Sequence, residues 1–125
     1  MLQSLRMAKT RNSETGAWGE AIAGKYLEEK KGFTILQRNL RLGKSEIDLL
    51  VMDGPVLVFV EVKVRKNNRF GNPEEFAGKQ KSSYLRRAAD LYLEQTGFSG
   101  LIRFDVVAIT GSPAFFDVLH LEDFI

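Results

Sequence analysis

The segment 56–65 constrains the fold more than any other part of this chain of 125 residues. Valine stands at every second position, and residues two apart on a strand point to the same face. The segment is therefore predicted to be a strand with one continuous apolar face. Its other face begins with leucine and phenylalanine and ends with Glu61, Lys63 and Arg65. Charges beside a core are costly to bury unless they are paired or bound to something, so this end of the strand is the first candidate for a site.

The remaining elements follow from apolar spacing and from turn residues. A first helix is predicted, which Ser13 or Thr15 can cap and which Gly32 ends. Further strands are predicted at 33–40, 46–52, 102–109 and 115–121, with a long helix at 74–95 and a loop around Gly111 between the last two strands. The order αβββαββ predicts a single α/β domain with a mixed central sheet flanked by helices. This domain would span 13–125, after a flexible basic arm at 1–12.

Composition narrows the class of protein. The chain has no cysteine, which excludes disulfides and thiolate metal sites and suits a reducing compartment. The longest apolar runs are strand-length stretches such as 56–60, far below the roughly 20 residues that a membrane helix needs. No continuous apolar segment follows the basic N-terminus, so a secretory signal is not expected. We therefore expect a cytoplasmic protein with no membrane partner.

Charge is unevenly distributed along the chain. The net charge is only +2, but residues 62–87 contain eight basic and two acidic groups. A concentrated positive region suits a polyanion such as DNA, although an ordinary solvated face is the alternative. The basic residues that we expect to contact nucleic acid are Arg65, Lys66, Arg69, Lys79, Lys81, Arg86 and Arg87.

A second acidic pair precedes the 56–65 strand. Glu46 and Asp48 share one face of the strand 46–52, and a turn signal follows at residues 53–55. That turn makes the two strands antiparallel neighbours and sets Asp48 opposite residues 60–62. We therefore expect the carboxylates of Asp48 and Glu61 to lie close together. Such a pair repels unless one group is protonated or a cation is bound, and carboxylate oxygens suit Mg²⁺.

This combination of groups predicts a phosphodiesterase site. A Mg²⁺ ion held by carboxylates polarises a phosphodiester and lowers the pKa of water. Lys63 beside it can orient that water or stabilise the transition state, which its charge favours over the alternative role of a general base. The plain alternative is an ion pair between Lys63 and Glu61 at a strand end. Two helical positions could complete the site: Glu20, unless it is a surface glutamate, and Gln80 with Tyr84, unless Tyr84 is core.

At this point the residues resemble a known pattern. The spacing Asp48…Glu61-x-Lys63 within αβββαβ order resembles the PD-(D/E)XK nuclease superfamily, which has a restriction-endonuclease-like core. More narrowly, the chain resembles the YraN-like family of small bacterial proteins, from about residue 13 to the C-terminus. The motifs that carry this resemblance are Gly16-x-x-Gly19-Glu20, Ser45-Glu46-Ile47-Asp48-Leu49, Val58-Phe59-Val60-Glu61-Val62-Lys63-x-Arg65, Phe70-Gly71-x-Pro73 and Arg103-Phe104-Asp105-Val106-Val107.

The resemblance implies a Mg²⁺- or Mn²⁺-dependent DNA endonuclease acting on branched or otherwise structured DNA, similar to archaeal Holliday-junction resolvases. It carries Glu20, Asp48, Glu61 and Lys63 onto active-site positions, with the three carboxylates as metal ligands. Gln80 and Tyr84, which lie one helical turn apart, look like a helical motif of related exonucleases. Serine at position 45 departs from the glycine usual in the family, which leaves the carboxylates untouched.

Two alternatives remain open from the sequence alone. One is a non-catalytic nucleic-acid-binding module with the same fold, which would have no need of clustered carboxylates that repel phosphate. The other is a structural subunit, which would leave the basic region unexplained. Symmetric cutting of a junction would require two active sites and hence a homodimer.

Overall fold

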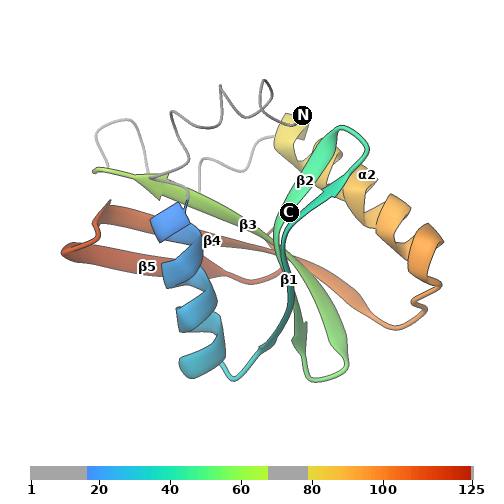
Figure 1. Cartoon of the computed structure of the whole chain (residues 1–125), viewed down its shortest axis with the longest axis horizontal. Coiled ribbons are helices and arrows are strands. Elements are labelled where there is room, and N and C mark those ends of the chain that lie inside the picture. Colours follow the sequence, from blue (N-terminus) through green and yellow to red (C-terminus); the bar gives the residue numbers. More distant parts are fainter. Residues whose placement is uncertain (1–16, 68–78, 125) are drawn as a thin grey trace.

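A computed structural model describes residues 17–67 and 79–124, with residues 79–83 described by their backbone alone. The described part begins in a helix at residues 17–29. It continues through β1 (Thr34–Leu42), β2 (Ser45–Asp53), β3 (Val56–Arg65), α2 (Lys79–Thr96), β4 (Ile102–Ser112) and β5 (Phe115–Leu121), shown in Figure 1. The predicted α/β class and order of elements are confirmed. The predicted arm at 1–12, both cap residues and positions 74–78 of the predicted long helix lie outside the described residues.

The five strands form one mixed sheet in the order β1-β2-β3-β4-β5. Neighbouring strands are antiparallel, except that β3 and β4 are parallel. A parallel pair cannot be joined by a tight turn and needs a crossover connection, and α2 lies in that connection. The mixed character of the sheet therefore follows from placing a helix between the third and fourth strands.

The two helices cover opposite faces of the sheet (Figure 1). The N-terminal helix packs Ala23 and Leu27 on the face that carries the valines of β3. The α2 helix packs Leu85 and Ala88 on the other face, against a cluster that contains Phe59. Each face of β3 is therefore buried by a different helix, as the alternation of its residues predicts.

Phe59 lies at the centre of the core on the α2 side. Its side chain is fully buried, and its ring stacks on Phe104 at 5.5 Å and meets the edge of Tyr92 at 5.9 Å, between ring centroids. Truncating such a residue to alanine typically costs about 3–5 kcal/mol. The apolar start of this face therefore anchors β3, and only its charged end is left for other uses.

The turn between β4 and β5 lies later than the sequence indicates. Gly111 was expected in the loop, but it lies in β4 opposite Phe116, and the turn occupies residues 113–114. Gly111 has a φ of 128°, and a Cβ there would collide with the backbone of Phe115. Glycine at this position therefore permits the strand pair to continue past the predicted end of β4, rather than breaking it.

Candidate active site

The candidate site lies where β2 and β3 separate. Backbone pairing of these strands runs from Asp53 opposite Val56 to Leu49 opposite Val60, and it stops there. Asp48 and Glu61 are the next residues in the same register. Beyond them the β1–β2 hairpin bends away from β3, as Figure 1 shows. We call this point, defined by Asp48 and Glu61, the β2–β3 fork. The predicted antiparallel pairing and the predicted register are both confirmed.

Asp48 bonds to the backbone of β3 across the fork. The N–H of Val62 donates a hydrogen bond of 2.8 Å to Oδ2 of Asp48. Along the paired part of the strands, backbone carbonyl oxygens accept such hydrogen bonds. At the fork, the carboxylate oxygen of Asp48 takes that place. This bond holds the Asp48 side chain toward β3, and thus toward Glu61.

Glu20 reaches this region from the N-terminal helix. A Cβ on Gly19 would collide with the side chain of Val64, so glycine allows the helix to pack closely on β3. The helix thereby brings the negative charge of Glu20 near enough to the β2–β3 fork to act on Asp48.

The pKa of Asp48 reflects its burial and the negative charges around it. Burial raises the pKa of this carboxyl, the charge of Glu61 raises it further, and the charges of Glu20 and Glu46 add to that effect. The hydrogen bond from Val62 opposes these contributions, and the pKa stands at about 7. A carboxyl with such a pKa is easily neutralised, either by a proton or by a bound cation.

Lys63 pairs with Glu61. Its Nζ atom lies 3.1 Å from Oε2 of Glu61, and the two side chains are 18% and 14% exposed. The predicted proximity of these two groups is therefore confirmed. The pair is largely withdrawn from water, so its charges are weakly screened and act strongly on anything bound at the β2–β3 fork.

A pocket of about 640 Å³ opens beside the fork on the α2 side. This volume lies within the range of small-molecule sites. Its lining residues come from the β1–β2 turn, both strands of the fork and α2: Lys44, Ser45, Glu46, Asp48, Glu61, Tyr84 and Leu85. Glu46, whose role the sequence left open, therefore lies on the pocket wall. Tyr84 is half exposed at this pocket rather than a core residue.

The donor set fits a cation that completes its coordination with substrate and water. Among the described residues, no group of three His, Asp or Glu side chains is arranged to hold a metal ion. The predicted trio of Glu20, Asp48 and Glu61 is therefore not a ready-made three-ligand site. Mg²⁺ commonly binds through one or two carboxylates together with waters and substrate phosphate. Asp48 and Glu61, with the negative charges of Glu20 and Glu46 acting on Asp48, fit that weaker requirement.

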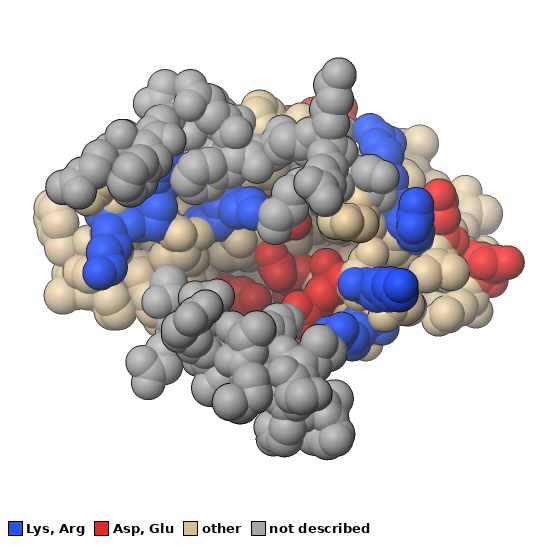
Figure 2. All heavy atoms as spheres, turned by 90° about the horizontal axis from the view of Figure 1, so that it is seen from above, with Lys and Arg blue, Asp and Glu red and all other residues tan. Residues whose placement is uncertain are grey.

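Basic side chains flank the acidic centre. Figure 2 shows Asp and Glu gathered in the middle of one face, with Lys and Arg on either side. Lys66 and Arg87 are exposed, and Arg65 is partly buried at the end of β3. The exposed Arg86 has its guanidinium carbon 4.9 Å from the centroid of the Phe104 ring.

Other predicted contacts have no described side chains. Gln80, Lys79 and Lys81 lie in the first turn of α2, where only the backbone is described, and Arg69 lies outside the described residues.

Lys44 is a pocket residue that the sequence analysis missed. It occupies the two-residue turn between β1 and β2, next to Gly43, whose φ is 62°. A glycine followed by a lysine just before an acidic strand was the only available signal. Knowing that the hairpin tip bends toward α2 requires the three-dimensional structure.

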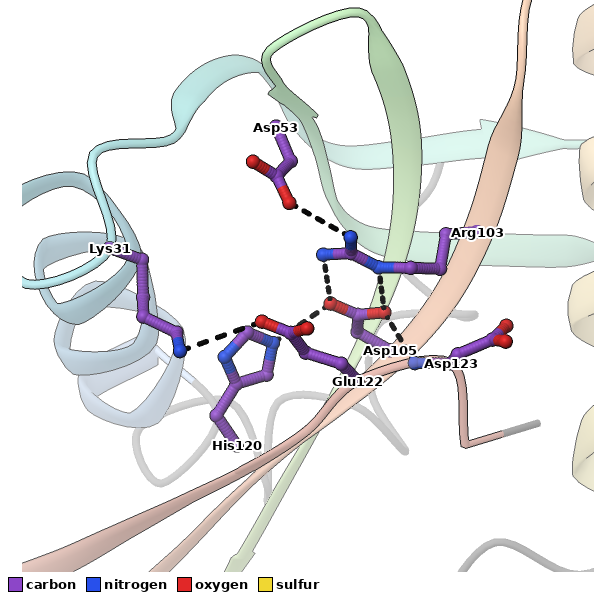
Figure 3. Close-up of polar contacts among 7 residues, drawn as sticks. All are labelled: Lys31, Asp53, Arg103, Asp105, His120, Glu122 and Asp123. Carbon is purple, nitrogen blue, oxygen red and sulfur yellow. Dashed lines mark hydrogen bonds and ion pairs between the residues drawn. The ribbon is translucent and has the colours of Figure 1, made fainter.

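The sequence also missed a polar network at the opposite end of β2 and β3 (Figure 3). Asp105 is fully buried and forms two hydrogen bonds with Arg103, at 2.9 and 3.0 Å, and one with His120 at 2.8 Å. Arg103 also donates to Asp53 at 2.8 Å, and the N–H of Asp123 donates to Asp105 at 2.9 Å. Nearly every oxygen lone pair of Asp105 is thus engaged, and this network ties the end of β2 to β4 and β5.

The pKa of Asp105 reflects this environment. Burial by itself raises the pKa, but the hydrogen bonds from His120, Arg103 and the Asp123 N–H outweigh burial and lower it below its usual value. The centre of the network is closed to solvent, because the side chains of Asp105 and His120 are 0% and 2% exposed, whereas Asp53 at its edge is 38% exposed. The two buried groups therefore stabilise the fold rather than meet a ligand.

Fold and site together define a three-layer α/β protein whose mixed sheet opens into a carboxylate-lined fork. None of the described helices is both long enough and apolar enough to cross a membrane. The chain belongs to the uncharacterised protein family UPF0102, whose family model matches residues 19–109. The predicted resemblance to the YraN-like family is thereby confirmed.

Relatives that share this family description come from several bacteria. A UPF0102 protein of Cytophaga hutchinsonii is 45% identical over 110 residues, which cover 88% of this chain and 94% of that relative. One of Syntrophomonas wolfei is 48% identical over 99 residues, covering 78% and 85%. One of Phocaeicola vulgatus is 36% identical over 112 residues, covering 90% and 92%. The chain is thus similar to these proteins over most of their length.

Proposed function

We propose that this protein is a metal-dependent endonuclease that hydrolyses phosphodiester bonds in DNA. The observation that carries the proposal is the meeting of Asp48, Glu61 and Lys63 at the β2–β3 fork. Two carboxylates and an ammonium group, on neighbouring strands that part beside a pocket, are the groups that metal-assisted phosphodiester hydrolysis requires. The resemblance to the PD-(D/E)XK nuclease superfamily supports the same reading.

Asp48 and Glu61 would hold Mg²⁺ or Mn²⁺, with Glu20 and Glu46 contributing negative charge nearby. When bound, the ion supplies Lewis-acid activation of both the phosphodiester and the attacking water. Asp48 is positioned for this task by its bond to the Val62 N–H. Its pKa of about 7 makes cation binding compete with protonation at neutral pH.

Lys63 would supply positive charge to the reacting phosphate. Its ammonium group lies 3.1 Å from Glu61, and carboxylate neighbours keep such a group charged. A charged lysine cannot accept a proton, so it acts by orienting water and by stabilising negative charge that grows in the transition state. Removing one such positioned group typically lowers the rate about 10²–10³-fold.

DNA is the proposed substrate because of the charges beside the fork. Exposed Lys66 and Arg87 can contact phosphates without reading bases, and they offset the repulsion between the carboxylates and a polyanion. The preference for branched or structured DNA rests on the family resemblance. Symmetric cutting of a junction by a cytoplasmic homodimer is part of the same proposal.

A cleavage assay with matched carboxylate variants tests the proposal. Synthetic branched, nicked, single-stranded and paired DNA are incubated with protein across a titration of Mg²⁺ and of Mn²⁺. We expect metal-dependent cutting by the parent protein and none by Asp48→Asn or Glu61→Gln. The exposed Asp117 on β5 provides the control, because Asp117→Asn also removes a carboxylate but should cut like the parent.

The assay also separates the alternative function. Binding of these DNA molecules by the parent without cleavage in either metal would show a non-catalytic nucleic-acid-binding module. Full activity of Asp48→Asn would refute the assigned site.

A further inference from the structure

The pocket beside the β2–β3 fork has two walls of different chemistry. Glu46, Asp48 and Glu61 form an acidic wall on β2 and β3. Tyr84 and Leu85 of α2 form a second wall, with an aromatic and an aliphatic side chain. The proposed metal binding uses the acidic wall and leaves the side chains of Tyr84 and Leu85 without a role.

Tyr84 is an aromatic residue of the pocket lining. It is 50% exposed, whereas its neighbour Leu85 is 3% exposed. An aromatic ring that lines a hollow beside a proposed phosphodiester site can stack on a nucleobase, because every base has a flat π-face. Burying an aromatic ring is favourable on its own, so a half-exposed ring at this place is suited to a ligand of matching shape.

Lys44 adds a positive charge to the pocket. It is exposed and lines the same pocket from the β1–β2 turn. Phosphates are repelled by the acidic wall except where a cation bridges them, and Lys44 attracts them on the hairpin side. A DNA strand bound between Lys44 and α2 would present one phosphate to the β2–β3 fork and the adjoining base to Tyr84.

We propose that this pocket receives an unpaired nucleotide next to the bond that is cut, with its base stacked on Tyr84. The inference rests on the proposed function for its ligand class and narrows that class to DNA with an unpaired nucleotide at the site. In a fully paired duplex the bases are stacked inside the helix, so no flat group projects into a hollow of about 640 Å³. A single strand, or a duplex with one extra nucleotide, supplies such a group without breaking a pair.

Binding measurements on matched DNA molecules test this proposal. Three oligonucleotides are compared by fluorescence anisotropy in Mg²⁺: a single strand, a duplex with one bulged nucleotide and a fully paired duplex. Each carries the fluorescent base 2-aminopurine at the same position. The Lys63→Met background slows cleavage of the probes, and Lys63 is not part of the pocket lining.

Three substitutions distinguish stacking from other effects. We expect Tyr84→Ala to weaken binding of the single strand and of the bulged duplex about 5- to 150-fold, as the loss of one base–aromatic stack predicts. Binding of the paired duplex should change less than about twofold. Tyr84→Phe keeps the ring and should bind like the background protein. Phe115 on β5 is 84% exposed and lies outside the pocket lining, so Phe115→Ala is the matched aromatic control.

The 2-aminopurine signal provides an independent readout. Stacking on Tyr84 should quench its fluorescence in the single strand and the bulged duplex, and Tyr84→Ala should abolish that quenching. Equal losses on all three DNA molecules, or no loss on any, would overturn the proposal.

Cleavage of the same three molecules by the parent protein separates the two ideas. Cleavage that is indifferent to Tyr84→Ala on every DNA refutes the stacking proposal and leaves the nuclease. Stacking that depends on Tyr84, without any cleavage, supports the stacking proposal and refutes the nuclease proposal.

Discussion

The replacement Asp48→Asn tests the electrostatics of the β2–β3 fork without any assay of activity. Asparagine has almost the same shape, and its side-chain oxygen can still accept the hydrogen bond from the Val62 N–H. The substitution therefore removes the ionisable group while the local contact is kept. Any change in the free energy of unfolding then reports the cost of the charge.

The magnitude follows from the pKa of Asp48. Folding raises this pKa from 3.8 to about 7, and one pKa unit corresponds to about 1.4 kcal/mol. Holding Asp48 ionised therefore costs up to about 4 kcal/mol when no cation is present. Because Asp48 is only partly buried, water screens part of this cost, and we expect a measured gain of about 2–4 kcal/mol for Asp48→Asn at pH 8.

The pH dependence has a definite sign. Below the unfolded value of 3.8 the carboxyl is protonated in both states and costs nothing. As pH rises from about 4 to about 7, the unfolded state loses its proton first, so the parent protein loses stability. The asparagine variant does not titrate at this position. The two proteins should thus be nearly equal in stability at pH 4 and should diverge up to pH 8.

Chemical denaturation in EDTA, at several pH values, measures this difference. Added Mg²⁺ should then stabilise the parent at pH 8 and have little effect on Asp48→Asn. The control is Asp117→Asn, which should follow the parent at every pH. A variant that is less stable than the parent at pH 8 in EDTA would refute the reasoning, because it would show that the charge is favourable rather than costly.

Three further outcomes are expected. Lys63→Met should keep DNA binding and lower cleavage about 10²–10³-fold; recovery of the full rate at high Mg²⁺ would instead show that Lys63 merely pairs with Glu61. Arg87→Ala should weaken binding of every DNA sequence alike and reduce the slope of log affinity against log salt by about one. Binding titrations at several salt concentrations measure this slope. Weaker binding of one sequence alone would contradict the prediction. Asp105→Asn should cost about 3–5 kcal/mol at pH 7, because it breaks a buried charged network. The pKa of Asp105 is lower in the folded protein than its unfolded value of 3.8, so the ionised carboxyl stabilises the fold above pH 3.8. The deficit should therefore shrink as pH falls below that value and through the lower folded pKa. A deficit that does not change with pH in denaturation curves would contradict the assignment.

Local pattern was sufficient to predict the element order and the pairing at the fork. The alternating valines of 56–65 gave the bounds of β3 as observed. The turn at residues 53–55 fixed the register and predicted Asp48 opposite residues 60–62, and the observed pairing of Leu49 with Val60 agrees with this. Both inferences depend only on residues close in sequence, where the two-residue period of a strand leaves few alternatives.

Features that depend on distant contacts could not be predicted. The bond between Arg103 and Asp53 joins residues 50 apart in sequence, and neither residue carries a local sign of its partner. The contribution of Lys44 depends on how the β1–β2 hairpin bends away from β3. The sequence pattern predicts a turn at Gly111, because a glycine in a strand and a glycine in a loop look alike until the partner strand is known.

The hydrogen bond from Arg103 to Asp53 also affects which substitutions this protein can accept during evolution. It ties the last residue of β2 to β4, five positions along β2 from Asp48, so strand alignment is secured away from the fork. A slip of one residue would turn every side chain of β2 to the other face, and the anchored end resists that slip whatever residues stand at the fork. Substitutions at Asp48 or Glu61 can therefore alter the chemistry while the strands keep their alignment. Such a chain can lose or acquire an activity by single changes and still fold.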